Sequence, residues 1–310
     1  MRLPTAYISH PDCLKHDMGP YHPECPQRLM VIEAQLLACG LLNQLQRHEA
    51  PLATFAQLAR VHTTDYIESV QRAAPTAGLI YLDPDTAMSP DTLNAALRAA
   101  GAVVLATELV LTHQVENAFC AVRPPGHHAE SAHAMGFCLF NNIAVGVAHA
   151  IECYDLQRIA IVDFDVHHGN GTEEIFRNNE RVMLCSTFQH PFYPYCGADS
   201  RRRNIVNVPL PAGTDGMAFR QAITDRWLPA LEEFQPQMLF ISAGFDAHRD
   251  DDLAQLLLDD ADYVWVTQQI KAFARKVANG HIVSVLEGGY ALNALGRCVT
   301  AHVKVLSGAD

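Results

Sequence analysis

Short apolar runs alternate along the chain with longer segments of helical spacing. The runs are nearly continuous in hydrophobic character and rich in β-branched residues, which predicts strands buried on both faces. They lie at residues 6–9, 117–122, 158–164, 181–187, 204–208, 238–243 and 281–286. Apolar residues at spacings of three and four predict helices. The helical segments are Pro26–Cys39, Pro90–Leu111, Asn141–Cys153, Asp215–Phe234, Asp259–Ala278 and Asn293–Leu306.

Continuous strands that alternate with helices predict an α/β fold, with a parallel sheet flanked by helices on both faces. The chain shows no internal repeat, low-complexity segment or linker, so we expect a single domain over residues 1–310. Ligands of such folds bind beyond the carboxyl ends of the strands. We therefore look for chemistry where each strand ends.

Composition narrows the class of protein. Hydrophobic residues make up 49% and charged residues 18% of the chain, as in a globular enzyme. The net charge of -12 argues against a nucleic-acid partner, because such binding neutralises phosphates. Nine cysteines without a C-x-x-C pair indicate reduced, mostly buried thiols in a cytoplasmic protein. No signal peptide is evident, and the apolar run at 99–111 contains Glu108 and is too short to span a membrane.

Polar groups appear where the run at 158–164 ends, at Asp163, Asp165 and His167. Residues two apart in an extended chain face the same side, so these three side chains project together. Carboxylates and an imidazole in this arrangement can share one divalent cation. Gly169 and Gly171 are then expected to let the backbone turn sharply. A capping turn with incidental histidines is less favoured, because buried aspartates need a cation or hydrogen bonds.

Two more strand ends carry similar groups. Asp246 follows the run at 238–243 and is either a third metal ligand or an ordinary helix N-cap. Tyr290 follows Gly288 and Gly289 after the last run, so it is either a presented phenol or part of a plain turn.

A histidine pair, His127 and His128, follows the rigid turn made by Pro124, Pro125 and Gly126. We expect at most one of these adjacent rings to enter the core. A pair beside a metal suits proton transfer, since imidazole titrates near neutral pH.

The motifs together resemble the histone deacetylase family and its arginase/deacetylase fold. The matching stretches, in the family's order, are HPECPQR, RPPGHHA, GFCLFNN, VDFDVHHGNG, AGFDA and EGGY. The resemblance implies zinc held by Asp165, His167 and Asp246. It also implies a catalytic set of His127, His128, Tyr290, Asp163 and Asn170. In that set Asp163 orients His127 and Asn170 partners His128; this asparagine and the His22–Arg28 signature are class II-like.

The resemblance extends to a substrate tunnel and to potassium. Phe137 and Tyr193 would form the tunnel's opposite walls, with Gly136, Leu253 and Gly288 also contacting substrate. The family's first potassium ion would be bound by Asp163, Asp165, His167, Ser186 and Thr187, and its second by Phe176, Asn179 and Val182.

Three activities are compatible with these residues. The first is a zinc-dependent amidohydrolase that removes acetyl or other acyl groups from lysine side chains by metal-activated water. The second is an acetylpolyamine amidohydrolase acting on a small acylated amine. Leu253, where polyamine-selective relatives carry glutamate, favours the first, although Asp250, Asp251 and Asp252 precede it. The third is a dimanganese ureohydrolase-like enzyme on the same fold. The partner is an acyl-lysine protein or peptide, or the small amine, and a homo-oligomer is compatible.

Overall fold

One sheet organises the molecule, and the computed structural model describes residues 3–309 of the chain. The eight strands are ordered β2-β1-β5-β10-β9-β6-β7-β8, and every neighbouring pair is parallel. This confirms the predicted parallel α/β fold. The strands are β1 Thr5–Ser9, β2 Gln46–Glu49, β5 Asn117–Cys120, β6 Ile159–Asp163, β7 Val182–Gln189, β8 Ile205–Leu210, β9 Met238–Ala243 and β10 Ile282–Leu286.

Seven of these strands lie in the predicted apolar runs, while β2 was missed. Its sequence, QRHE, is polar because β2 is an edge strand with alternating exposure. A separate antiparallel hairpin, β3 Ile80–Asp83 and β4 Thr86–Met88, was also missed.

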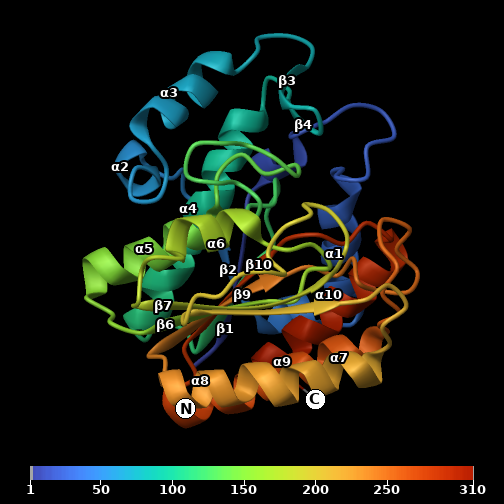
Figure 1. Ribbon diagram of the computed structural model, residues 1–310. Coiled ribbons are helices and arrows are strands. Elements are labelled where there is room, and N and C mark those ends of the chain that lie inside the picture. Colours follow the sequence, from blue (N-terminus) through green and yellow to red (C-terminus); the bar gives the residue numbers. More distant parts are fainter. Residues whose placement is uncertain (1–2, 310) are drawn as a thin grey trace.

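Helices cover both faces of the sheet (Figure 1). Helices α4 and α5 pack together on one face, and α1, α10 and α9 pack in sequence on the other. The longer helices are α1 Gln27–Ala38, α3 Thr64–Ala73, α4 Thr92–Leu111, α5 Asn142–Tyr154, α9 Asp260–Val277 and α10 Leu292–Ser307. The shorter ones are η1 Pro11–Leu14, η2 Leu41–Gln44, α2 Phe55–Leu58, α6 Asn170–Phe176, α7 Gly216–Ala222, η3 Ile223–Trp227 and α8 Leu228–Phe234.

The helix predicted over Asp215–Phe234 is not uniform. It consists of α7, a π-helical turn η3 and α8, which carries a proline in its first turn. Pro229 has no backbone N–H to donate, so it cannot make the regular bond to the preceding turn. A π-turn at this point absorbs the irregularity.

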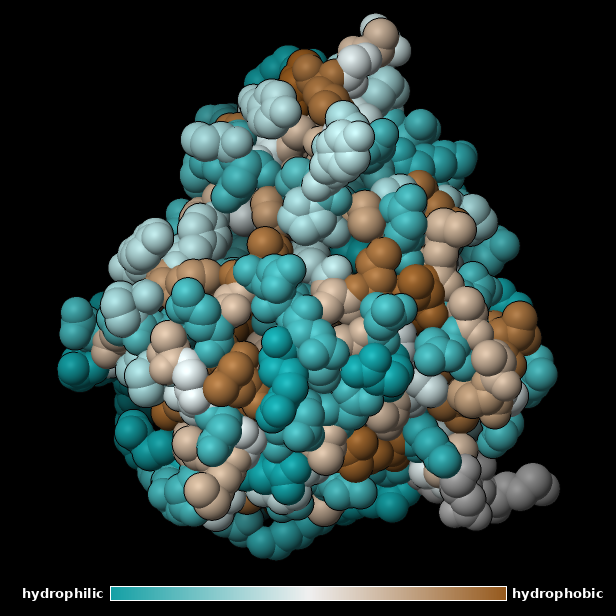
Figure 2. Space-filling view, turned by 90° about the vertical axis from the view of Figure 1, so that its right-hand side faces the viewer, coloured by the Kyte–Doolittle hydropathy of each residue, from teal (hydrophilic) through white to brown (hydrophobic). Residues whose placement is uncertain are grey.

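Helix α4 is long and apolar enough to cross a membrane by length and composition alone, but 67% of its most apolar stretch is buried inside the protein. The apolar run at 99–111 is only part of this helix, which begins at Thr92 and has 20 residues. It packs on α5, β1, β5 and β10, as a core helix does. On the face shown in Figure 2, hydrophobic residues are scattered among hydrophilic ones.

The sheet order brings four strand ends together at its centre. Strands β5, β10, β9 and β6 are consecutive neighbours, and all four are buried along their length. Their carboxyl ends lead into the segments that carry the candidate side chains.

Candidate active site

Three candidate ligands meet beyond the ends of β6 and β9. One ligand atom from each of Asp165, His167 and Asp246 lies within 4.8 Å of the others. Nδ1 of His167 is 3.1 Å from Oδ1 of Asp165 and 3.2 Å from Oδ2 of Asp246. That Oδ2 atom is buried and accepts no hydrogen bond. A buried carboxylate oxygen without a donor is costly, so the cluster fits a bound cation.

Backbone amides orient both carboxylates. The N–H of Gly288 donates to Oδ2 of Asp165 over 2.8 Å, and that of Val166 donates to Oδ1 of Asp246 over 2.9 Å. Burial and the carboxylate of Asp165 raise the pKa of Asp246 to about 6. Burial alone would lower the pKa of His167, but the carboxylates of Asp165 and Asp246 outweigh burial and raise that pKa to about 10. The cluster thus favours a positive charge between its two carboxylates, which a divalent cation would supply.

Glycines let the backbone approach these carboxylates closely. A Cβ at Gly244 would lie 2.0 Å from Oδ2 of Asp165, and one at Gly288 would lie 2.0 Å from Oδ2 of Asp246. Gly169 has the same role toward Oδ2 of Asp163, at 2.5 Å. Its φ of -73° is one that any residue adopts, and the backbone turns sharply here as expected, because the N–H of Asn170 donates to the carbonyl of His168 over 2.8 Å. Gly171 likewise allows close packing, 2.2 Å from the carbonyl oxygen of Ala129.

A second cluster of ligand types, His248, Asp260 and Cys298, does not fit a metal. Nδ1 of His248 accepts the N–H of Asp250, so Nε2 carries the hydrogen that it donates to Asp260. Neither ring nitrogen keeps a free lone pair. The Asp260 carboxylate also accepts two hydrogen bonds from Arg297.

Both histidines of the pair are buried, with His127 2% and His128 4% exposed. The expectation that at most one would enter the core was therefore wrong. Polar partners make the burial tolerable: Nδ1 of His127 lies 3.0 Å from Oδ2 of Asp163, and Nδ1 of His128 lies 2.8 Å from Oδ1 of Asn170. The two ring centroids are 4.1 Å apart.

The hydrogen-bond network decides the tautomer of His128. The amide nitrogen of Asn170 donates to Oε1 of Glu130, which leaves Oδ1 of Asn170 as the acceptor. Nδ1 of His128 must then carry the hydrogen, and Nε2 keeps a free lone pair. Burial and the neighbouring His127 and His167 rings hold the pKa of His128 well below its usual value.

His127 is the opposite case. Burial alone would lower its pKa, but the carboxylates of Asp165 and Asp163 outweigh burial and raise that pKa to about 10. The two adjacent rings thus have opposite affinities for a proton, one favouring the charged and the other the neutral form.

Tyr290 lies on a tightly held loop after β10. Its ring sits 4.9 Å from Cζ of Arg28, whose Nε donates to the carbonyl of Gly289 over 2.7 Å. The backbone N–H of Tyr290 donates to Oδ2 of Asp251 over 2.6 Å. Burial raises the pKa of this phenol well above its usual value despite the opposing charge of Arg28, so the hydroxyl keeps its hydrogen.

Sequence reasoning missed the role of Arg28, although the residue closes the HPECPQR stretch. Its guanidinium and that of Arg123 both bind the buried carboxylate of Glu24. A signal was present in the sequence. Glu24 and Arg28 lie where helix α1 begins, Arg123 lies just after β5, and all three charged side chains are buried.

A cavity of about 240 Å³ is lined by one of the candidate ligands, His167, together with both rings of the histidine pair and Tyr290. Phe192 stacks on His167 with ring centroids 5.6 Å apart, and Tyr193 meets His128 edge-on at 5.3 Å. Sequence reasoning preferred Tyr193 to Phe192, whereas the structure lines the cavity with both. Phe137 stands perpendicular to the Tyr290 ring, 6.0 Å away. The remaining wall residues are Asp85, Pro125, Gly136, Leu253 and Gly288.

Two of these wall residues have defined structural roles. Gly136 has a φ of +57°, and a Cβ there would lie 2.4 Å from the His128 ring. Asp85 accepts the N–H of Gly136 over 2.9 Å and so ties the β3–β4 hairpin to the cavity. No sequence signal pointed to Asp85, because its segment has no periodic pattern.

The residues expected to hold potassium lie in two places. Ser186 pairs with Asp163 across β7 and β6, and the hydroxyls of Ser186 and Thr187 are buried without hydrogen bonds. Such unpartnered oxygens beside Asp163 fit a monovalent cation. Phe176, Asn179 and Val182 lie on the turn between α6 and β7, where their carbonyls accept hydrogen bonds from Asn204.

Comparison with known proteins gives one consistent result. A family model described as the histone deacetylase domain matches residues 22–306. A probable deacetylase of Archaeoglobus fulgidus is 37% identical over 296 residues, covering 93% of this chain and 82% of that protein. A histone deacetylase-like amidohydrolase of Pseudomonas aeruginosa is 35% identical over 328 residues, covering 98% of this chain and 86% of that protein. The crystal structure of the HDA15 HD domain matches with a TM-score of 0.93 at 36% identity, and the match covers 99% of this chain and 88% of that one.

The parallel sheet and the polar cluster at its carboxyl edge define a hydrolase on the arginase/deacetylase α/β fold. The chain belongs to the histone deacetylase family, which the family model and both relatives show. This confirms the resemblance read from the motifs.

Proposed function

We propose that this protein is a zinc-dependent amidohydrolase that removes acetyl or other acyl groups from lysine side chains. One observation carries the proposal: two buried aspartates and an imidazole face one another beside a histidine whose Nε2 is free. Family membership supports a hydrolase acting on acylated substrates.

Asp165, His167 and Asp246 would hold the zinc ion. Three protein ligands leave a coordination position open, which is the arrangement of catalytic zinc sites. A divalent ion bound there would act as a Lewis acid on the scissile amide and its attacking water. The unpartnered Oδ2 of Asp246 supports a cation at this position.

The chain's own groups would handle the protons. Nε2 of His128 would accept the proton of the attacking water, because its other nitrogen is occupied by Asn170. The pair His127 and His128 would then return a proton to the leaving amine. Asp163 keeps His127 oriented throughout. The Tyr290 hydroxyl would donate a hydrogen bond to the substrate's carbonyl oxygen as negative charge develops on it.

Aromatic walls favour an acyl-lysine over a polyamine. Phe137, Phe192 and Tyr193 would grip the apolar stem of a lysine side chain. Two of the three aspartates that might attract a polyamine are engaged elsewhere, and the third, Asp252, is exposed to solvent. Asp251 is buried and bound by the backbone N–H groups of Tyr290 and Ala291. Asp250 pairs with Arg297 at 3.6 Å.

A dimanganese ureohydrolase-like activity is the weaker alternative. Such a site needs further carboxylate or histidine ligands beside the first three. Among residues 3–309, the only other group of ligand types that could hold a metal is the one at His248, which has no free ring nitrogen.

We further propose a single catalytic domain in the cytoplasm, with an acyl-lysine protein or peptide as partner and neither nucleic acid nor membrane. All nine cysteines are free, which supports a reducing compartment.

The deciding experiment measures metal content and activity together. Protein stripped by a chelator and reloaded with one equivalent of Zn²⁺ should cleave an acetyl-lysine peptide faster than N-acetylspermidine. Asp246→Ala should lose both bound zinc and activity, because one of three ligands is removed. Asp199→Ala, at a fully exposed carboxylate on the β7–β8 loop, is the control and should match the wild type.

Full zinc content and full activity in Asp246→Ala would contradict the ligand set. Faster cleavage of N-acetylspermidine would redirect the substrate proposal to polyamines, and two metal ions per active chain would favour the ureohydrolase.

A further inference from the structure

Three backbone carbonyls converge between helix α6 and strand β7. They belong to Phe176, Asn179 and Val182, the residues where the family resemblance implied a second potassium ion. The side-chain nitrogen Nδ2 of Asn204 lies 3.0, 3.2 and 3.0 Å from these three oxygens. The amide nitrogen thus stands at the point on which all three carbonyls converge.

An amide NH₂ group offers two hydrogens of partial positive charge, which the three carbonyl oxygens share. The carbonyls of Phe176 and Asn179 also accept the backbone N–H groups of Asn179 and Val182, over 2.9 and 3.0 Å. The amide group therefore replaces the attraction that a monovalent cation would provide, without bringing a full charge. The backbone holds Asn204 in place, because its carbonyl accepts the N–H of Leu184 in β7 over 2.9 Å.

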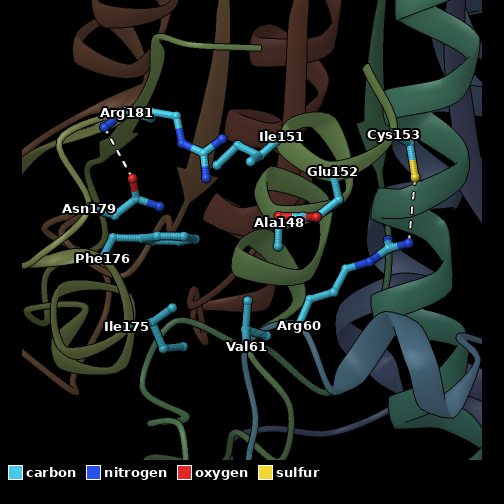
Figure 3. A pocket seen from close by; sticks show the side chains of 10 residues that line it. All are labelled: Arg60, Val61, Ala148, Ile151, Glu152, Cys153, Ile175, Phe176, Asn179 and Arg181. Carbon is cyan, nitrogen blue, oxygen red and sulfur yellow. Dashed lines mark hydrogen bonds between the residues drawn. The ribbon is translucent and has the colours of Figure 1, made fainter. Parts of the chain in front are cut away.

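The side chain of Asn179 does not add a ligand for a cation. Its Oδ1 accepts the backbone N–H of Arg181 over 3.1 Å, and Figure 3 shows this bond at the edge of a cavity of about 460 Å³. The turn therefore contributes only backbone carbonyls, and the amide of Asn204 already uses them.

The electrostatic surroundings also oppose a cation. Asn204 lines a hollow of about 750 Å³ whose wall carries five arginines and two glutamates. The arginines are Arg158, Arg177, Arg201, Arg202 and Arg203. Like charges repel an incoming ion, and the repulsion is strongest at low salt, where screening is weak.

The first potassium site presents the opposite situation. There the hydroxyls of Ser186 and Thr187 are buried without a hydrogen-bond partner, next to the carboxylate of Asp163. One site thus has oxygens without a positive partner, and the other has its oxygens satisfied by the protein itself.

We infer that Asn204 is a built-in substitute for the second monovalent cation, so that the chain binds one such ion and not two. The inference concerns ion stoichiometry and stability and does not depend on the proposed substrate.

The test counts potassium ions and follows thermal stability. Zinc-loaded protein is exchanged into tetramethylammonium chloride and titrated with KCl at constant ionic strength. Bound K⁺ is measured by equilibrium dialysis with elemental analysis, and Tm by fluorescence. Wild type should bind one K⁺ per chain. Asn204→Ala should bind two, with a Tm that falls without K⁺ and recovers by about 5 °C when K⁺ saturates the new site.

Two variants serve as controls. Asn178→Ala alters an exposed asparagine on the same turn and should bind one ion, as wild type does. Ser186→Ala should weaken K⁺ binding at the first site, beside Asp163, and leave the Asn204 region unchanged. Two ions per wild-type chain, or a single ion in Asn204→Ala, would overturn the inference. If Asn204→Ala does not fold, the wild-type stoichiometry alone still decides.

Discussion

At the scale of single residues, the proton affinities in the candidate site depend on which atoms of neighbouring side chains are already used in hydrogen bonds. Glu130 fixes the Asn170 amide, Asn170 fixes the hydrogen on His128, and Nε2 is left as the free nitrogen. His127 has a carboxylate partner instead of an amide and differs accordingly. Two identical side chains, adjacent in sequence, thereby acquire different proton affinities.

The Tyr290 hydroxyl gives the sharpest prediction at this scale. Tyr290→Phe should lower kcat about 10²–10³-fold, because loss of one oxyanion donor has this typical cost. KM and zinc content should change little, since the ring and its contact with Arg28 remain. Steady-state kinetics with elemental analysis checks both. Unchanged kcat would remove the phenol from the reaction.

At the scale of helices and strands, glycines determine how closely elements approach the site. Gly244 and Gly288 follow β9 and β10, and any side chain at either position would collide with a carboxylate.

The start of helix α5 is held by a hydrogen-bonded histidine. Its N-cap, Asn141, donates its backbone N–H to Nε2 of His62, while Nδ1 of that ring donates to the carbonyl of Glu130.

This anchoring predicts a pH-dependent stability. Burial lowers the pKa of His62 to about 4 from 6.5. Between these values the unfolded chain binds the proton and the folded protein does not. The stabilisation is therefore complete above pH 6.5 and decreases as the pH falls toward 4, by roughly 3 kcal/mol in total.

His62→Gln should reduce the stability loss between pH 6.5 and 4.5, because glutamine can accept the Asn141 bond without titrating. Urea unfolding at several pH values measures the free energy of unfolding of each variant. His113→Gln, at an exposed histidine, is the control. Parallel pH curves for wild type and His62→Gln would show that His62 does not contribute.

At the scale of the whole molecule, the sheet joins distant parts of the chain. Strand β10 lies between β5 and β9, so the last strand in sequence completes the centre of the sheet. Helix α10 packs on α1 from the beginning of the chain. Neither the α1 segment nor the β10–α10 segment can detach without disrupting the core.

This interleaving predicts one cooperative unfolding transition for the zinc-loaded protein. Calorimetric and van't Hoff enthalpies should agree, as expected when no part unfolds separately. Two resolved transitions in differential scanning calorimetry would argue against the single domain over residues 1–310.

The sequence by itself determined the parallel sheet and the places of its chemistry. Strands buried on both faces are almost continuously apolar, so charged residues such as Asp163 appear only where they end. The same reasoning missed β2, because an edge strand need not be apolar.

Only the tertiary structure decided which groups meet. Arg28 reaches a carbonyl 261 positions away, and Asn204, in the turn before β8, reaches the carbonyls of the turn before β7. Contacts of this kind leave no periodic signal, because they depend on how strands are ordered in the sheet. Local sequence patterns report what each segment buries, whereas the sheet order decides which segments become neighbours.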